Sequence, residues 1–122
     1  MNVYVIPGAP IPLARPRFGK HVWDSQKLIK EEVGLWIITQ RPKGYELLKN
    51  ALELHITFYF KRSKHNKLPH HSIKPDLSNL IKFYEDVCTG ILYDDDKQII
   101  KIVAEKNYDD YPRTEFYLKE IE

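Results

Sequence analysis

The stretch LELHITFYF, residues 52–60, alternates apolar and other side chains without interruption. Its apolar residues lie on one side of an extended chain, and these are Leu52, Leu54, Ile56, Phe58 and Phe60. The residues on the other side are Glu53, His55, Thr57 and Tyr59. A period of two is typical of a β-strand that buries one face. The chain is therefore expected to contain a sheet with one covered face.

Two segments, one before and one after this strand, have the periodicity of helices that could cover the buried face of the sheet. Apolar residues at Ile29, Val33, Trp36 and Ile37 predict a helix that starts after a cap at Asp24 or Ser25 and ends at Arg41-Pro42. A second helix is predicted from Leu77 to about Thr89, where Gly90 is a plausible stop. Its expected core stripe consists of Leu80, Ile81, Tyr84, Val87 and Cys88.

Three more strands are predicted, at residues 3–6, 99–105 and 114–121. The turn-forming residues between 107 and 112 predict an antiparallel hairpin for the last two strands. Residues 61–75 have no periodicity, contain five Lys or Arg, three His and no acid, and are expected to form a loop. The order strand, helix, strand, helix, strand, strand predicts a single α+β domain over residues 1–122, with a small mixed sheet and two main helices.

Composition narrows the protein class. The chain has 122 residues, 43% of them hydrophobic and 30% charged, with a net charge of +2, which suits one soluble domain. One cysteine, Cys88, excludes a disulfide within the chain and a cysteine-based zinc cluster. The N-terminus does not resemble a signal peptide, and no apolar run reaches the ~18 residues of a membrane span. A cytoplasmic protein is therefore expected.

Acidic residues gather at both ends of the second predicted helix. Asp76 precedes this helix, and Asp94, Asp95 and Asp96 follow it. On the helix itself, Ser78, Lys82 and Glu85 stand at positions i, i+4 and i+7 of one polar strip. Oxygen ligands without cysteine favour Mg²⁺, Mn²⁺ or Ca²⁺, and a nearby lysine can stabilise charge that develops on a phosphate.

These residues also have plainer interpretations. Three consecutive aspartates are common in a solvated turn, Asp76 can be a helix N-cap, and Lys82 with Glu85 can be an exposed helix pair. The basic loop can be a solvated linker. Spacing alone therefore favours metal-dependent cleavage of nucleic acid only weakly.

Longer motifs add a family resemblance. The segments are KPDLSNLIK at 74–82, EDVCTG at 85–90, YDDDKQI at 93–99 and VIPGAPIPLARPRF at 5–18. Together they resemble the RusA family of Holliday junction resolvases, small endonucleases common in phages and prophages, over essentially the whole chain. The resemblance implies a RusA-like fold and a homodimer that cuts junction DNA by paired symmetric nicks. It also implies a requirement for Mg²⁺, with Mn²⁺ as a possible replacement, in a bacterial host or a phage.

The resemblance assigns roles to individual residues. It implies Asp76, Lys82 and Asp96 as catalytic residues and Asp76, Asp95 and Asp96 as metal ligands. A second motif aspartate is replaced by Ser78, whose neutral hydroxyl is a poor Mg²⁺ ligand. Either Glu85, two turns further along the same helix face, substitutes for it, or the site is weakened and the protein only binds branched DNA.

Affinity for a branched polyanion requires cations. The expected DNA-binding residues are Arg15, Arg17, Lys20, Lys61, Arg62, Lys64 and Lys67. Phe18 and Trp23 could wedge into an unstacked junction or belong to the core. A third alternative keeps the nuclease chemistry but directs it to flaps, forks or other replication branches.

Overall fold

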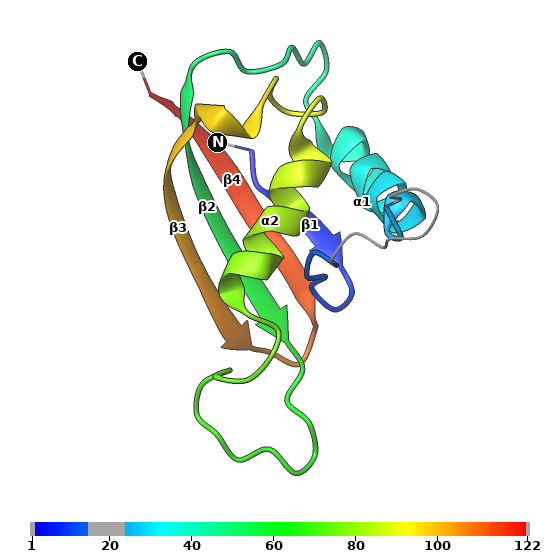
Figure 1. The fold of residues 1–122 in the computed structure, drawn as a ribbon, viewed down its shortest axis with the longest axis vertical. Coiled ribbons are helices and arrows are strands. Elements are labelled where there is room, and N and C mark those ends of the chain that lie inside the picture. The colour runs from blue at the N-terminus through cyan, green and yellow to red at the C-terminus, as the bar shows by residue number, and fades with distance from the viewer. Residues whose placement is uncertain (1, 15–23, 122) are drawn as a thin grey trace, which may run out of the picture.

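The computed structural model describes residues 2–14 and 24–121. In these residues a four-stranded mixed sheet carries both helices on one face, which makes the predicted α+β fold correct (Figure 1). The elements are β1 (Tyr4–Pro7), α1 (Lys27–Gln40), β2 (Ala51–Phe60), α2 (Leu77–Cys88), the single 3₁₀ turn η1 (Asp96–Gln98), β3 (Ile99–Tyr108) and β4 (Arg113–Ile121).

The predicted hairpin of the last two strands is wrong. The strand order is β1-β4-β2-β3, so β2 lies between β3 and β4 and pairs parallel with β3 and antiparallel with β4. The short turn after β3 crosses the end of β2, where the amide of Asp109 donates to the carbonyl of Phe60 at 2.9 Å. The reason is that α2 connects β2 to β3, and a helical crossover joins parallel neighbours. The other side of β2 is then left for β4.

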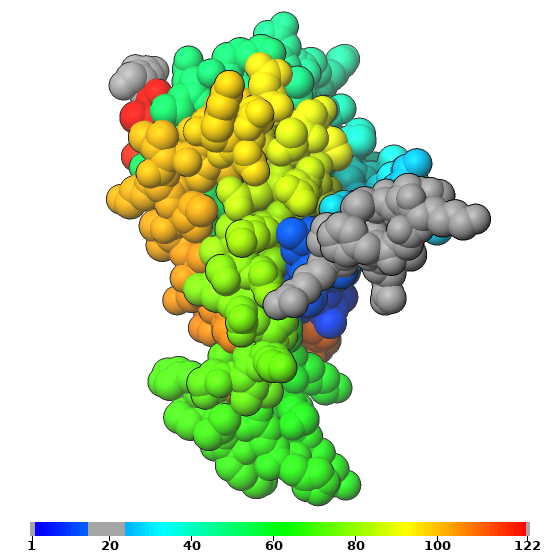
Figure 2. All heavy atoms as spheres, viewed as in Figure 1, coloured from blue at the N-terminus to red at the C-terminus, as the bar shows by residue number. Residues whose placement is uncertain are grey.

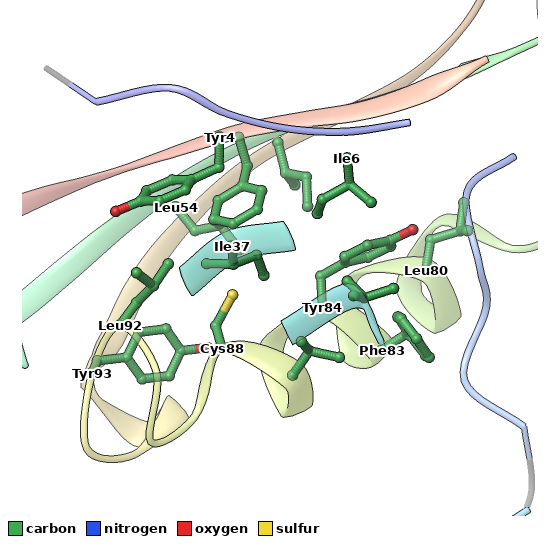
Figure 3. Packing of buried hydrophobic residues seen from close by; sticks show 14 of the residues in the cluster. Tyr4, Ile6, Ile37, Leu54, Leu80, Phe83, Tyr84, Cys88, Leu92 and Tyr93 are labelled. Atoms are coloured by element: carbon green, nitrogen blue, oxygen red, sulfur yellow. The ribbon is translucent and has the colours of Figure 1, made fainter. Parts of the chain in front are cut away.

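The core lies between the sheet and the two helices (Figure 3). The four apolar residues of β2 from Leu52 to Phe58 are buried as predicted, and Cys88 is buried with them. Phe83, which the predicted stripe omits, is fully buried. The prediction that Trp36 faces the core is wrong, because 47% of this residue is exposed on the outer side of α1.

Helix α2 ends close to the predicted residue. Its last residue is Cys88, and Gly90 adopts a φ of +83°, which glycine reaches without the steric cost that a side chain would add. Helix α1 begins at Lys27, and the predicted cap at Asp24 or Ser25 is wrong, because Gln26 occupies the N-cap position without a side-chain capping bond. Asp24 instead lies before the cap, where its Oδ1 accepts the Gln26 amide at 2.8 Å.

The basic loop, residues 61–75, has a small core of its own. His71 is buried and stacks on the ring of Phe60, with the ring centroids 4.0 Å apart, and also contacts Tyr108. The ammonium of Lys106 on β3 donates to the carbonyls of Ile73 and Pro75 at 2.8 and 2.9 Å. These contacts attach the loop to the ends of β2 and β3. The rest of the loop extends beyond the sheet (Figures 1 and 2).

In the described residues, neither helix has the length and apolar character needed to cross a membrane.

Candidate active site on helix α2

Helix α2 presents a fixed polar face because its other face is buried. Leu80, Phe83, Tyr84, Val87 and Cys88 all lie in the core. The Tyr84 hydroxyl accepts the Ile11 amide at 3.0 Å and contacts the Thr114 hydroxyl at 3.1 Å, which ties the helix to the N-terminal segment and to β4. The polar strip predicted from the sequence therefore faces outward, with Ser78 and Lys82 exposed and Glu85 half-buried.

The turn after α2 is held firmly to the rest of the domain. The Tyr93 hydroxyl, which is buried, donates to the carbonyl of Glu85 at 2.8 Å. From the segment after α1, the Tyr45 hydroxyl donates to the carbonyl of Leu92 at 2.6 Å, and Arg41 donates to that of Ile91 at 3.0 Å. These bonds set the direction in which the chain leaves α2 towards the aspartates.

Gln98 then fixes the aspartates themselves. Its side-chain oxygen accepts the amides of Asp94 and Asp95, both at 3.0 Å. Its side-chain nitrogen donates to the carbonyls of Leu48 and Asn50 at 2.9 and 3.0 Å. A single amide thus joins the aspartate turn to the segment that leads into β2. The sequence prediction gave this glutamine no role, although it is part of the quoted motif YDDDKQI.

Two carboxylates from different elements share one electrostatic environment. The pKa of Glu85 is raised by partial burial and then by the charges of Asp96 and Asp86, while Lys82 lowers it. The pKa of Asp96 is raised by desolvation, by contact with the carboxyl group of Asp95 and by the charges of Asp95 and Asp86. Each carboxylate therefore resists ionisation, first because burial removes water from it and then because other negative charges are close to it.

Asp95 differs from Asp96 although the two are adjacent. Asp95 caps η1, and its Oδ1 accepts the Lys97 amide at 2.9 Å. That hydrogen bond to the charged form lowers the pKa of Asp95. The pair thus consists of one readily ionised carboxylate and one that holds its proton more tightly.

Two of the acids in the quoted motifs have basic partners, whereas the other four do not in the described part of the chain. Asp94 pairs with Lys49 at 2.7 Å, and Asp86 lies 3.6 Å from the ammonium of Lys30. Within residues 2–14 and 24–121, no Lys, Arg or His forms an ion pair with the remaining motif acids, which are Asp76, Glu85, Asp95 and Asp96. A cation from outside the chain would balance the charge that these residues leave uncompensated.

The predicted catalytic residues do not form a single cluster, because Asp76 and Lys82 lie along α2 and Asp96 lies in the turn η1 that follows it. Asp76 occupies the N-cap position, yet its side chain accepts no capping hydrogen bond. Nine residues separate Asp76 from Glu85, a rise of about 14 Å along the helix. Lys82 stands one turn before Glu85. The structure brings Glu85, Asp95 and Asp96 to one end of α2 and leaves Asp76 and Ser78 at the other.

The donor set at the Glu85 end fits Mg²⁺ in its chemistry. All side-chain donors there are carboxylate oxygens, and Mg²⁺ commonly binds proteins through one or two carboxylates while it keeps several waters. Among the described residues no three His, Cys, Asp or Glu side chains converge on one point as a complete set of ligands would. Glu85 and Asp96 are two carboxylates at this end of α2 whose charges interact.

The expected DNA-binding residues fall into three groups. Arg15, Arg17 and Lys20, together with Phe18 and Trp23, lie outside the described residues. Lys61, Lys64 and Lys67 are exposed on the loop of residues 61–75. Arg62 is engaged within that loop, because its guanidinium donates to the carbonyl of Leu68 and covers the ring of Tyr108 at 4.0 Å.

Comparisons with known proteins agree with the motifs. The chain is 26% identical to an uncharacterised Bacillus subtilis protein, YqaN, in an alignment that covers 97% of this chain and 95% of the relative. The family model described as endodeoxyribonuclease RusA matches residues 7–119, a range that contains both helices, β2, β3, most of β4 and the aspartate turn. The chain therefore belongs to the RusA endodeoxyribonuclease family.

Proposed function

We propose that this protein is a Mg²⁺-dependent endonuclease that resolves Holliday junctions by paired symmetric nicks and acts as a homodimer. One observation carries the proposal. Tyr93 of the turn after α2 donates to the backbone carbonyl of Glu85, and the charge of Asp96 in that turn adds to the burial that raises the Glu85 pKa. Uncompensated carboxylates in fixed positions are typical of a cation site.

In this proposal Glu85 and Asp96 hold the ion, and Asp95 completes the acidic turn. Mg²⁺, or Mn²⁺ in its place, would supply a Lewis acid that polarises the scissile phosphodiester. Gln98 keeps the aspartate turn in place, since it bonds the amides of Asp94 and Asp95. Lys82, one turn before Glu85 on the exposed strip, stabilises the negative charge that develops on the phosphate.

Asp76 has a separate role in the same mechanism. Its carboxylate is exposed, is free of a capping bond and lies beside the basic loop. DNA that follows α2 would contact the loop lysines at one end and the acidic turn at the other (Figure 2). Asp76 would then act on the bound strand at the loop end, either as a ligand for a second ion or by orienting the substrate.

Glu85 substitutes for the motif aspartate that Ser78 replaces. Glu85 shares charge interactions with Asp96 and Lys82, whereas Ser78 stands about two turns away towards Asp76. The acidic function at this site would therefore have moved along the helix. This substitution predicts a specific requirement for the Glu85 carboxylate in cleavage.

A second function is favoured by a separate observation. Asp76 is separated from the Glu85 end, and no three acidic side chains converge in the described residues. These facts suit a protein that holds branched DNA without cutting it. The two functions predict opposite results for cleavage and the same result for binding.

The deciding experiment uses a synthetic four-way junction with each strand labelled in turn. We expect paired nicks at symmetric positions in Mg²⁺, less cleavage of forks and flaps, and none of linear duplex. Binding without nicking in Mg²⁺ or Mn²⁺ would support the non-cutting alternative. Preferential cleavage of forks would move the substrate to replication branches. The Asp76→Asn variant, tested in parallel, guards against a contaminating nuclease.

A further inference from the structure

The two edges of the sheet differ in protection. At one edge, β1 has only four residues, and the side chain of Gln40 covers it. The Gln40 amide nitrogen donates to the carbonyl of Val5 and its oxygen accepts the amide of Val5, both at 2.8 Å. This side chain takes the place of a neighbouring strand, so pairing with another chain is blocked there.

The opposite edge is long and open. It is formed by β3, with ten residues and no proline. Within the described parts of the chain, no hydrogen bond reaches the backbone groups on its outer side. Its apolar side chains are unusually exposed, with values of 65% for Ile100, 41% for Ile102 and 47% for Val103. Native proteins seldom leave such an edge free, because it pairs readily with another strand.

The sequence of this edge is complementary to itself. In an antiparallel pairing centred on Val103, Lys101 of one copy faces Glu105 of the other, and symmetry repeats the pair. Lys101 and Glu105 lie on the same side of the sheet as Val103, because they align with Glu53, Thr57 and His55 of β2. A register centred on Lys101 would instead place two lysines face to face, which is unfavourable.

We propose that β3 pairs antiparallel with β3 of a second copy of this chain, with Val103 on the two-fold axis. The two four-stranded sheets then form one continuous sheet. The axis stands perpendicular to that sheet, so the helix-covered faces of both copies lie on the same side. This inference deepens the proposed paired cleavage and rests on it for its biological purpose.

The arrangement suits a branched substrate. Asp96 lies seven residues before Val103, which places it about 20 Å from the axis at the rise of a 3₁₀ turn and a strand. The two acidic turns would be about 40 Å apart and would face the same side, where a single junction could contact both. A face-to-face packing of the two open sheet surfaces would point the sites in opposite directions.

A cross-linking experiment tests the register without DNA. In an antiparallel sheet, residues directly opposite each other have Cα atoms about 4.5–5.5 Å apart, which lies within the range that a disulfide spans. The full-length Val103→Cys variant should therefore form a covalent dimer under mild oxidation. Cys88 does not interfere, because it is buried and its thiol pKa is raised by burial.

Leu35→Cys is the matched control. Leu35 is 62% exposed on the outer face of α1, so its thiol would be at least as accessible as one at position 103. We expect no covalent dimer from this variant. Cross-linking through Leu35→Cys but not through Val103→Cys would overturn the proposal and place the interface on α1.

Charge exchange provides a second, reversible test by sedimentation velocity. Lys101→Glu and Glu105→Lys should each weaken dimerisation at least about tenfold, because each places two pairs of like charges in contact. The double variant should restore the dissociation constant to within about threefold. Lys101 also lies 3.8 Å from Glu53 in its own chain, so thermal unfolding must show that each variant is folded.

The outcomes separate this inference from the proposed function. A dimer that survives both single charge reversals, or a double variant that stays weak, would overturn the β3 interface. A wild-type protein that is monomeric at tens of micromolar would also overturn it. Junction nicking by such a monomer would leave the nuclease assignment standing, whereas a β3 dimer that never nicks DNA would count against the nuclease alone.

Discussion

Gln98→Ala tests whether the aspartate turn is positioned by the bonds of one side chain. The variant removes four hydrogen bonds, two from the amides of Asp94 and Asp95 and two to the carbonyls of Leu48 and Asn50. A net value of about 0.5–1.5 kcal/mol for each would give about 2–6 kcal/mol. Water can replace part of this at the exposed bonds, so we expect a loss of about 2 kcal/mol in the free energy of unfolding.

The effect on cleavage should be about as large, in free energy, as the effect on folding. With the turn released, Asp95 and Asp96 sample other positions, and a loss of about 2 kcal/mol in preorganisation corresponds to about a 30-fold lower rate. The assay is single-turnover cleavage of a four-way junction over a range of Mg²⁺ concentrations, at a temperature where the variant is folded. We expect a lower rate and a higher Mg²⁺ requirement, with junction binding unchanged within about twofold.

Two comparisons make the result decisive. Thr39→Ala removes an exposed side-chain bond to the carbonyl of Trp36 on α1, remote from the turn, and should leave cleavage unchanged. Gln98→Glu retains the side-chain acceptor but loses both donors and adds a negative charge, so it should be impaired as well. A folded Gln98→Ala variant that cleaves at the wild-type rate and Mg²⁺ dependence would refute the positioning role.

Three further predictions concern other parts of the molecule. Glu85→Gln should reduce Mg²⁺-dependent cleavage at least about 100-fold while junction binding in a gel-shift assay persists, because the amide cannot replace a carboxylate ligand; full activity would exclude Glu85 as the substitute. Lys64→Gln with Lys67→Gln should reduce the slope of log affinity against log salt by about 1.8, whereas an unchanged slope would mean that neither lysine contacts phosphate. Burial and the charge of Lys106 lower the pKa of His71, so the neutral form is favoured in the folded loop. The packing of that loop is therefore complete above about pH 6.5 and weakens as the pH falls through that value towards the lower pKa of the folded state. Hydrogen exchange in residues 61–75 should then accelerate in acid, and His71→Phe should remove that pH dependence.

The sequence predicts those parts of the fold that depend on local periodicity. The alternation in β2 and the apolar stripe of α2 each state which face is buried, and the structure agrees. The predicted hairpin of β3 and β4 is wrong because the residues of the turn between them do not show that β2 lies between the two strands. The helical connection from β2 to β3 contained that information, since it favours a parallel pair.

The candidate site is predictable in composition but only partly in geometry. Motif resemblance names Asp76, Lys82, Asp95 and Asp96, and helix spacing nominates Glu85. Spacing alone could not show that Asp76 stands about 14 Å from Glu85 along α2, or that Asp96 shares the environment of Glu85. The roles of Gln98 and Tyr93 depend on contacts with residues distant in the sequence, such as Leu48, and these become visible only in the folded chain.

The basic loop shows the same limit. Its charge predicts contact with DNA, yet Arg62 is held by Tyr108, and His71 forms the loop's small core instead of serving as a ligand. Both partners of His71 come from strand ends, Phe60 from β2 and Tyr108 from β3. Their proximity follows from the parallel pairing of those strands, in which Phe60 and Tyr108 are direct neighbours.

The most direct test of the account is junction cleavage by Asp96→Asn beside Asp94→Asn. The two residues lie two positions apart in one turn, but Asp94 pairs with Lys49, whereas the charge of Asp96 helps to raise the pKa of Glu85. In Mg²⁺, with a four-way junction as substrate, the account predicts paired symmetric nicks by the wild type and by Asp94→Asn, and at least about a 100-fold loss for Asp96→Asn with binding retained. Nicking by Asp96→Asn at the wild-type rate, or no nicking by the wild type, would contradict it.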